Sequence, residues 1–150
     1  MSCKKNKKKA PPAMQSHSHS RKCCDEMVLP LVEDLTTTPT PVLMINTGDG
    51  FSPVRQLAIE AEVSPTQTTG AETTATFQLA IDGEPVGAPV EVVLDDVDGL
   101  PPGERQSIVL RFTANVEAGA HLVTLIASSD QPADLNPTDG GARLTVCSSA

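Results

Sequence analysis

Apolar and polar residues alternate along several short stretches of the chain, most clearly between Ala75 and Leu94. Phe77, Leu79 and Ile81 occupy every second position, the period that places side chains on one face of a β-strand. Asp82-Gly83 follows, and this pair tolerates the positive φ of a tight turn. The pattern predicts a β-hairpin whose return strand is irregular until about Val90. We expect its core side chains to be Phe77, Leu79, Ile81, Val90, Val92 and Leu94.

Similar short stretches precede and follow this hairpin. They are rich in aliphatic and β-branched residues and are separated by Gly, Pro, Asp and Thr clusters, and no stretch has a sustained 3.6-residue apolar period. The expected strands include residues 42–45, 57–63, 108–112, 121–127 and 142–148. Many short strands joined by turns predict a single all-β domain, an antiparallel β-sandwich or jelly roll of about eight strands.

The first 24 residues differ in composition from the rest of the chain. They contain seven lysines and arginines and no acidic residue, whereas the remainder contains all 19 acidic residues against four arginines, a net charge of −15. The first segment has too little apolar surface to offset the entropy lost on ordering, so we expect a flexible arm. We therefore divide the chain into residues 1–27, a basic N-terminal connector arm with Cys and His, and residues 28–150, a jelly-roll domain.

Two parts of the sequence resemble known proteins. TFQLAIDGEPVG, followed by PPGERQSIVLRFTANVEAGAHLVTLIAS, is similar to the C1q/tumour-necrosis-factor-like jelly rolls that form head domains on bacterial spore-surface and phage fibre proteins. A Cys-Cys pair ahead of a small jelly roll, with another Cys in the final strand, resembles the subunits of endospore appendages. In that family the connector of one subunit is cross-linked to a neighbour by disulfides. This resemblance implies that Cys23 and Cys24 are connector cysteines and Cys147 a body acceptor.

The four cysteines allow three interpretations. Adjacent Cys23 and Cys24 hold their sulfurs in poor geometry for a mutual bond, so intersubunit disulfides to Cys147 and Cys3 of neighbours are one interpretation. Such bonds persist only in an oxidising setting. Alternatively, the arm thiols are reduced and Cys147 is a small buried apolar residue. The third interpretation is a Zn or Cu(I) site, although its spacing matches no standard zinc module, formed by Cys3, His17, His19, Cys23 and Cys24.

Other ionisable residues are expected to have structural roles. His121 has no evident nucleophile or orienting acid, and we interpret it as a surface histidine. The run from Asp95 to Asp98 could bind Ca²⁺, but it lacks the later Glu of an EF-hand loop and is interpreted as a solvated acidic loop. The same interpretation applies to Asp130, Asp134 and Asp139. We therefore expect no enzyme activity, no catalytic residue, no metal ligand and no cofactor.

Composition narrows the classes of partner. Three Phe and no Trp or Tyr argue against aromatic carbohydrate platforms and base-stacking surfaces. Neither a long apolar run nor an N-terminal signal segment is present, so we expect no membrane insertion and no classical secretory signal. The lysine run could contact nucleic acid or an anionic surface, but we favour contact with the acidic bodies of neighbouring subunits.

These observations predict a structural, self-assembling subunit of an extracellular fibre or spore-surface appendage. Its main partner is another copy of itself, in a homo-oligomer or filament, joined through the N-terminal arm and intersubunit disulfides. An anchoring surface protein is a second candidate partner, and no small-molecule substrate is expected. The alternatives are a trimeric C1q/tumour-necrosis-factor-like head of a spore or phage fibre, and a metal-binding module that uses the Cys/His arm.

Overall fold

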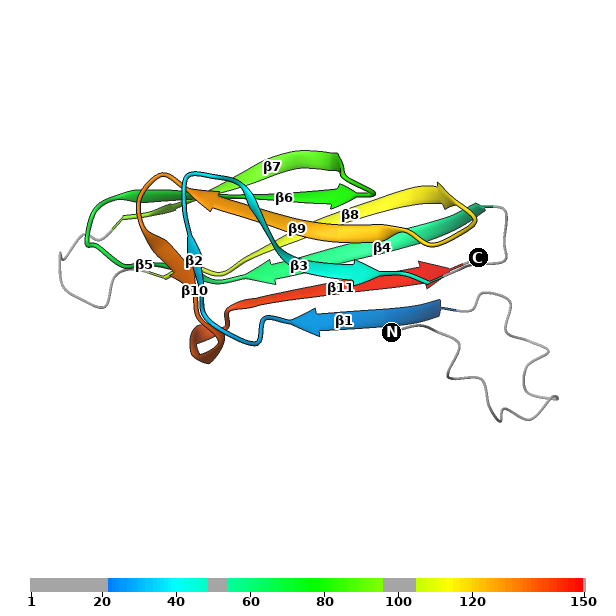
Figure 1. Cartoon of the computed structure of the whole chain (residues 1–150), viewed down its shortest axis with the longest axis horizontal. Helices are drawn as coiled ribbons and strands as arrows, with labels where there is room; N and C mark the ends of the chain where they lie inside the picture. The colour runs from blue at the N-terminus through cyan, green and yellow to red at the C-terminus, as the bar shows by residue number, and fades with distance from the viewer. Residues whose placement is uncertain (1–21, 49–53, 96–104, 150) are drawn as a thin grey trace.

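The computed structural model describes residues 22–48, 54–95 and 105–149 of the chain. Within these ranges it contains eleven strands, which pair only in the antiparallel sense, and one short 3-10 helix. Two four-stranded sheets face each other, and a three-stranded sheet lies at one end (Figure 1). This arrangement is an all-β sandwich.

The four strands of what we call sheet 1 are, in spatial order, β1 (Lys22–Val28), β11 (Ala142–Ser149), β4 (Val54–Val63) and β8 (Ile108–Glu117). Those of sheet 2 are β3 (Thr40–Asn46), β9 (Leu122–Ser129), β6 (Thr73–Ile81) and β7 (Glu84–Leu94). The small sheet contains β2 (Glu33–Leu35), β10 (Ala133–Leu135) and β5 (Pro65–Gln67), and helix η2 (Pro137–Asp139) follows β10.

The connectivity of the longer strands is that of a jelly roll. When the eight strands of seven or more residues are counted in chain order, sheet 1 has the order 1-8-3-6 and sheet 2 the order 2-7-4-5. A polypeptide that alternates between two sheets in this way forms the double Greek key of a jelly roll. The predicted fold class is confirmed. The strand count rises from about eight to eleven because three three-residue strands form the small sheet.

The core lies between the two large sheets and follows from the alternation in the sequence. Every second side chain of β4, β6 and β9 points inward and is buried, and Phe77 at the centre of β6 is completely inaccessible to solvent. Of the core residues predicted for the hairpin, Val90 is partly buried and the other five are buried. The aliphatic core expected from the composition is therefore present.

The return strand of the hairpin is irregular, as predicted. Phe77 lies opposite Val90 and Leu79 opposite Val86, so three residues of β7 face the single residue Gln78. The Gln78 side-chain amide donates hydrogen bonds at the bulge to the carbonyl oxygens of Val86 (2.9 Å) and Gly87 (3.2 Å). Gly87 has φ +72°, a conformation that favours glycine.

Strand β1 includes residues that the sequence pattern assigned to the arm. Residues 22–27 pair with β11, so the expected boundary between residues 27 and 28 falls inside a strand. The sequence KCCDEMV does not alternate between apolar and polar residues, because β1 is an edge strand with few buried positions. The position of β1 in the sheet depends on its backbone pairing with β11. The sequence of β1 alone carries no information about that pairing.

Candidate functional site

A disulfide joins Cys24 to Cys147 on the outer face of sheet 1. The two residues lie directly opposite each other in β1 and β11, with sulfurs 2.00 Å apart and Cα atoms 3.9 Å apart. The bond connects the edge strand to an interior strand, across 123 residues of sequence. Cys24 is exposed and Cys147 is half-buried, so the bond lies at the surface.

This bond lies within one chain, whereas the sequence predicted disulfides between subunits. Cys3 lies outside the described residues, and Cys23 is placed only by its backbone, opposite Ser148 in β11. Intersubunit bonding by these cysteines stays a prediction. Because Cys24 and Cys147 are paired here, their intersubunit use would require the intrachain bond to open first.

Charged side chains cover the same outer face of sheet 1 next to the disulfide. Arg143 of β11 lies between two glutamates, with its Nε 3.3 Å from Oε2 of Glu26 and its Nη1 3.6 Å from Oε1 of Glu62. Arg111 pairs with Glu60, with Nε and Oε1 3.7 Å apart. All of these side chains are about half exposed or more, so each pair contributes little to stability. Together they link all four strands across the sheet.

A buried arginine closes the end of the sandwich at which β1 begins. Arg55 is 6% exposed and donates hydrogen bonds to Oγ of Ser148 (3.2 Å), Oγ1 of Thr47 (3.3 Å) and the carbonyl oxygen of Gly119. The backbone N–H of His121 also donates to Oγ1 of Thr47, at 3.0 Å. The guanidinium group thus ties β4 to β11, to the segment after β3 and to the β8–β9 turn, which is a structural role.

His121 forms a second link at this end of the molecule. Its Nδ1 lies 2.6 Å from Oδ2 of Asp82, its Nε2 lies 2.8 Å from the carbonyl oxygen of Glu117, and the N–H of Leu122 donates to Oδ1 of Asp82 at 2.9 Å. The hydrogen bond with Asp82 raises the pKa of His121, and the same bond lowers the pKa of Asp82. Both ring nitrogens are engaged in joining two turns, so neither is positioned to activate a nucleophile.

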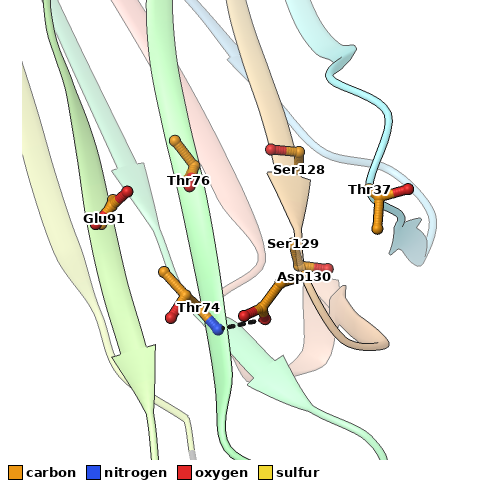
Figure 2. Close-up of a pocket in the computed structure, with 7 residues that line it drawn as sticks. All are labelled: Thr37, Thr74, Thr76, Glu91, Ser128, Ser129 and Asp130. Atoms are coloured by element: carbon orange, nitrogen blue, oxygen red, sulfur yellow. Dashed lines mark hydrogen bonds between the residues drawn. The ribbon is translucent and has the colours of Figure 1, made fainter.

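A groove crosses the outer face of sheet 2 at the opposite end of the sandwich (Figure 2). Thr76 of β6 lies directly opposite both Glu91 of β7 and Ser128 of β9, so these three side chains form one row across the sheet. The N–H of Thr74 donates to Oδ1 of Asp130 at 2.7 Å, and the N–H of Asp130 donates to the Thr74 carbonyl at 3.1 Å. The groove has a volume of about 450 Å³ and is lined by Thr37, Thr74, Thr76, Glu91, Ser128, Ser129 and Asp130.

The groove continues into a smaller, more apolar hollow of about 270 Å³. The two share Thr37, Ser129 and Asp130, and the hollow adds apolar side chains that include Leu35 and Pro132. No Lys, Arg, His or Cys among the described residues lines either of them. Hydroxyls and carboxylates can bind a cation or hydrogen-bonding groups.

The sequence assigned Asp130, Asp134 and Asp139 to a solvated acidic loop, and the structure places them differently. Asp130 lines the groove, and Asp134 lies on β10 directly opposite Asp34 of β2. Partial burial, followed by the charges of Asp34 and Asp139, raises the pKa of Asp134. The Arg105 side chain forms an ion pair with Asp139, with Nη1 and Oδ1 3.7 Å apart. Asp95 is exposed just after β7.

The remaining candidate ligands cannot be placed. His17, His19, Asp96 and Asp98 lie outside the described residues. In the described part of the chain, no three His, Cys, Asp or Glu side chains are grouped as metal ligands would be. The same residues include no helix with the length and hydropathy needed to span a membrane.

The groove was missed by sequence reasoning because its residues are far apart in the chain. Thr37, residues 74–76, Glu91 and residues 128–130 come from separate elements and meet only when β9, β6 and β7 pair in this order. The sequence contains only a weak signal for this groove. Thr74, Thr76 and Ser128 occupy outward-facing positions of strands, where hydroxyl side chains are common.

No protein-family profile and no curated protein matches the chain. Solved structures with a similar arrangement include the C-terminal domain of EclA, described as a sugar-binding protein, with a TM-score of 0.43, 10% identity and coverage of 83% of this chain and 74% of that one. A structure of infectious bursal disease virus strain Gx has a TM-score of 0.41 and 13% identity, over 89% and 32% of the two chains. A family 35 carbohydrate-binding module from Clostridium thermocellum has a TM-score of 0.36 and 14% identity, over 83% and 90%. These TM-scores lie below 0.5, and the fold assignment rests on strand connectivity alone.

Proposed function

We propose that this protein is a structural, self-assembling subunit of an extracellular fibre or spore-surface appendage. In this proposal the N-terminal segment of one copy joins the body of a neighbour. The observation that carries it is the attachment of that segment. Residues 1–21, with most of the chain's positive charge, lead directly into edge strand β1, and the Cys24–Cys147 bond fixes β1 covalently to a body of opposite charge.

The architecture of the body suits a building block. In the described part of the chain, both large sheets end in strands with a single paired neighbour, β1 and β8 in sheet 1 and β3 and β7 in sheet 2. The free edge of such a strand presents unpaired backbone N–H and C=O groups, which can accept an added strand from another chain. The body thus offers surfaces for non-covalent assembly.

The disulfide supports an oxidising location. Disulfides persist in extracellular and cell-surface settings and are rare in reducing compartments. In the same setting, cysteines near the start of the chain could form covalent bonds between subunits that are already in contact. We therefore keep Cys3, Cys23, Cys24 and Cys147 as candidates for intersubunit bonding. In the first step, a thiolate of Cys3 or Cys23 from a neighbour would attack one sulfur of the Cys24–Cys147 bond, forming an intersubunit disulfide and releasing the other cysteine as a thiolate.

The experiment compares the full chain with a variant that lacks residues 1–21, because a deletion up to residue 24 would also remove the first part of β1. A matched control replaces the five lysines between positions 4 and 9 by glutamine and keeps the length of the segment. Assembly is measured by electron microscopy and by sedimentation, with and without reductant. We expect filaments or large oligomers from the full chain and folded monomers from the deletion variant.

Assembly by the deletion variant, or monomers from the full chain, would overturn the proposal. A trimer that does not depend on concentration and retains an unattached N-terminal segment would instead support the alternative of a trimeric head domain. If the lysine-to-glutamine control assembles as well as the full chain, the segment acts through its backbone and cysteines and not through its charge.

A further inference from the structure

The groove on sheet 2 is negatively charged. The charged side chains that line it are the carboxylates of Glu91 and Asp130, and the remaining lining side chains are hydroxyls of Thr and Ser. The pairing of Thr74 with Asp130 holds one carboxylate in a defined position, and the register of β6 and β7 places Glu91 beside Thr76. We propose that this groove receives the lysine-rich segment of a second copy of the chain, an inference that rests on the proposed function.

Charge complementarity supports this occupant. Five lysines lie within residues 4–9, so an extended segment presents ammonium groups on both of its sides. Ammonium groups pair with Glu91 and Asp130, while Thr and Ser hydroxyls can donate to and accept from the backbone of an extended chain. Among residues 22–48, 54–95 and 105–149, no basic side chain lines the groove and competes for these carboxylates.

The residues that follow the lysines match the hollow next to the groove. The sequence Ala10-Pro11-Pro12-Ala13 is small and apolar, and proline has no backbone N–H that would need a partner. The hollow is lined in part by Leu35 and Pro132 and continues directly from the groove. A segment that is basic and then apolar therefore faces a surface that is acidic and then apolar.

The position of the groove favours a neighbour over the same chain. Lys22, where the segment joins the body, belongs to sheet 1 and pairs with Ser149, near the end closed by Arg55. The groove lies on sheet 2 at the far end of β9, as the path of that strand shows (Figure 1). To reach its own groove, the segment would have to pass around the sandwich and along its length.

The length of the segment is sufficient for a neighbour placed end to end. Twelve residues separate Lys9 from Lys22, and the thirteen steps from one Cα to the other span up to about 45 Å when extended, whereas the eight residues of β9 span about 27 Å. A contact between opposite ends of identical subunits is heterologous, and it generates an open filament unless the rotation closes a ring. The proposed docking would thus account for a fibre.

The test uses a zero-length carbodiimide, which joins an amine to a carboxylate only when the two are in contact. Full-length protein labelled with ¹⁵N is mixed with unlabelled protein, assembled and cross-linked, and cross-linked peptides are identified by mass spectrometry. We expect mixed-isotope cross-links between lysines 4–9 and Glu91 or Asp130. Cross-links from these lysines to other carboxylates, such as Glu60 and Glu62, or exclusively within one chain, would overturn the inference.

Matched variants provide an independent measurement. E91Q/D130N removes the two groove charges but keeps an acceptor oxygen for Thr74, whereas E84Q/E117Q removes two exposed charges at the other end of the sandwich. We expect the first variant to raise the concentration needed for assembly about tenfold at low salt, with the difference disappearing near 1 M salt, and the second to have a smaller effect. Equal behaviour of the two variants would overturn the inference. Filaments of normal stability with cross-links elsewhere would leave the proposed function intact, whereas absence of assembly by the full chain would overturn both.

Discussion

The outer faces of sheets 1 and 2 are built from the same kind of alternating strand, but different interactions hold their strands together. On sheet 1, a disulfide and ion pairs of two arginines link the side chains of neighbouring strands. On sheet 2, the corresponding positions hold Thr, Ser, Gln and aliphatic residues, and Glu91 is the charged side chain that its described strands place in the groove. The disulfide and the ion pairs that join neighbouring strands face to face thus lie on sheet 1, whereas the pairs His121–Asp82 and Arg105–Asp139 involve turns and loops.

This difference suggests that the two layers have separate roles. Sheet 1 contains the strand to which the N-terminal segment is attached, so links between its strands keep that strand in place. Sheet 2 has a groove lined with the carboxylates of Glu91 and Asp130 and with Thr and Ser hydroxyls, which can bind cations and hydrogen-bonding groups. The buried sides of both sheets are mostly apolar, and this distinction lies in the outward-facing positions.

The largest expected effect comes from removing the disulfide of sheet 1. The C24S/C147S variant should lose about 2–5 kcal/mol of unfolding free energy, because the cross-link no longer restricts the unfolded chain. Urea unfolding measures the loss, and hydrogen exchange should show that β1 amides lose protection while those of β6 and β9 keep more of theirs. Equal stability of the variant and the oxidised parent would show that sheet 1 does not depend on this bond. Reductant should destabilise the parent and leave the variant unchanged.

A smaller loss of stability is expected when the hydrogen bond between Thr74 and Asp130 on sheet 2 is removed. Asp130→Ala removes the acceptor for the N–H of Thr74 and should cost about 0.5–1.5 kcal/mol, the usual contribution of one hydrogen bond. Asp130→Asn keeps an acceptor oxygen and should cost less. Urea unfolding of the two variants side by side makes the comparison. If Asn is as destabilising as Ala, the charge matters and the hydrogen bond does not.

The hydrogen bond between His121 and Asp82 predicts that the free energy of unfolding depends on pH. The pKa of His121 is raised above 6.5, so its stabilising contribution is complete below that pH and is lost as the pH rises through the raised value. The pKa of Asp82 is lowered below 3.8, so its contribution is complete above that pH and is lost as the pH falls. Unfolding free energy should therefore decrease between pH 6 and pH 8.5, and less so in H121Q. An unchanged pH slope in H121Q would contradict this assignment, and D82N should show the same reduced slope.

The smallest effect concerns the ion pairs of sheet 1. Arg143→Gln should cost at most about 1 kcal/mol, because both of its glutamate partners are half exposed to solvent. Arg111→Gln, which loses a single partner, should cost less. Chemical unfolding at low and high salt tests both, since salt should abolish the difference. A difference that persists at high salt would mean that Arg143 contributes through packing.

The sequence predicts the interior of this protein better than its surface. Alternation identified the strands around Ile59, Phe77 and Leu125 because each is buried on one face, and Asp82-Gly83 identified the tight turn. Strand β1 was missed because an edge strand with few buried residues has no such period. The groove and the Cys24–Cys147 bond could not be predicted from local pattern, because they depend on which strands become neighbours.

The position of the disulfide also determines how the subunit would respond to tension. A pull on the chain at Lys22 would peel β1 from β11 one residue pair at a time, and only the pairs of Lys22 and Cys23 precede the cross-link. Beyond that point the force passes through the sulfur atoms into β11, which also pairs with β4 along the whole length of β11. Separating β11 from the sheet would require many hydrogen bonds to break together. The cross-link thus changes peeling at an edge into resistance by the whole layer.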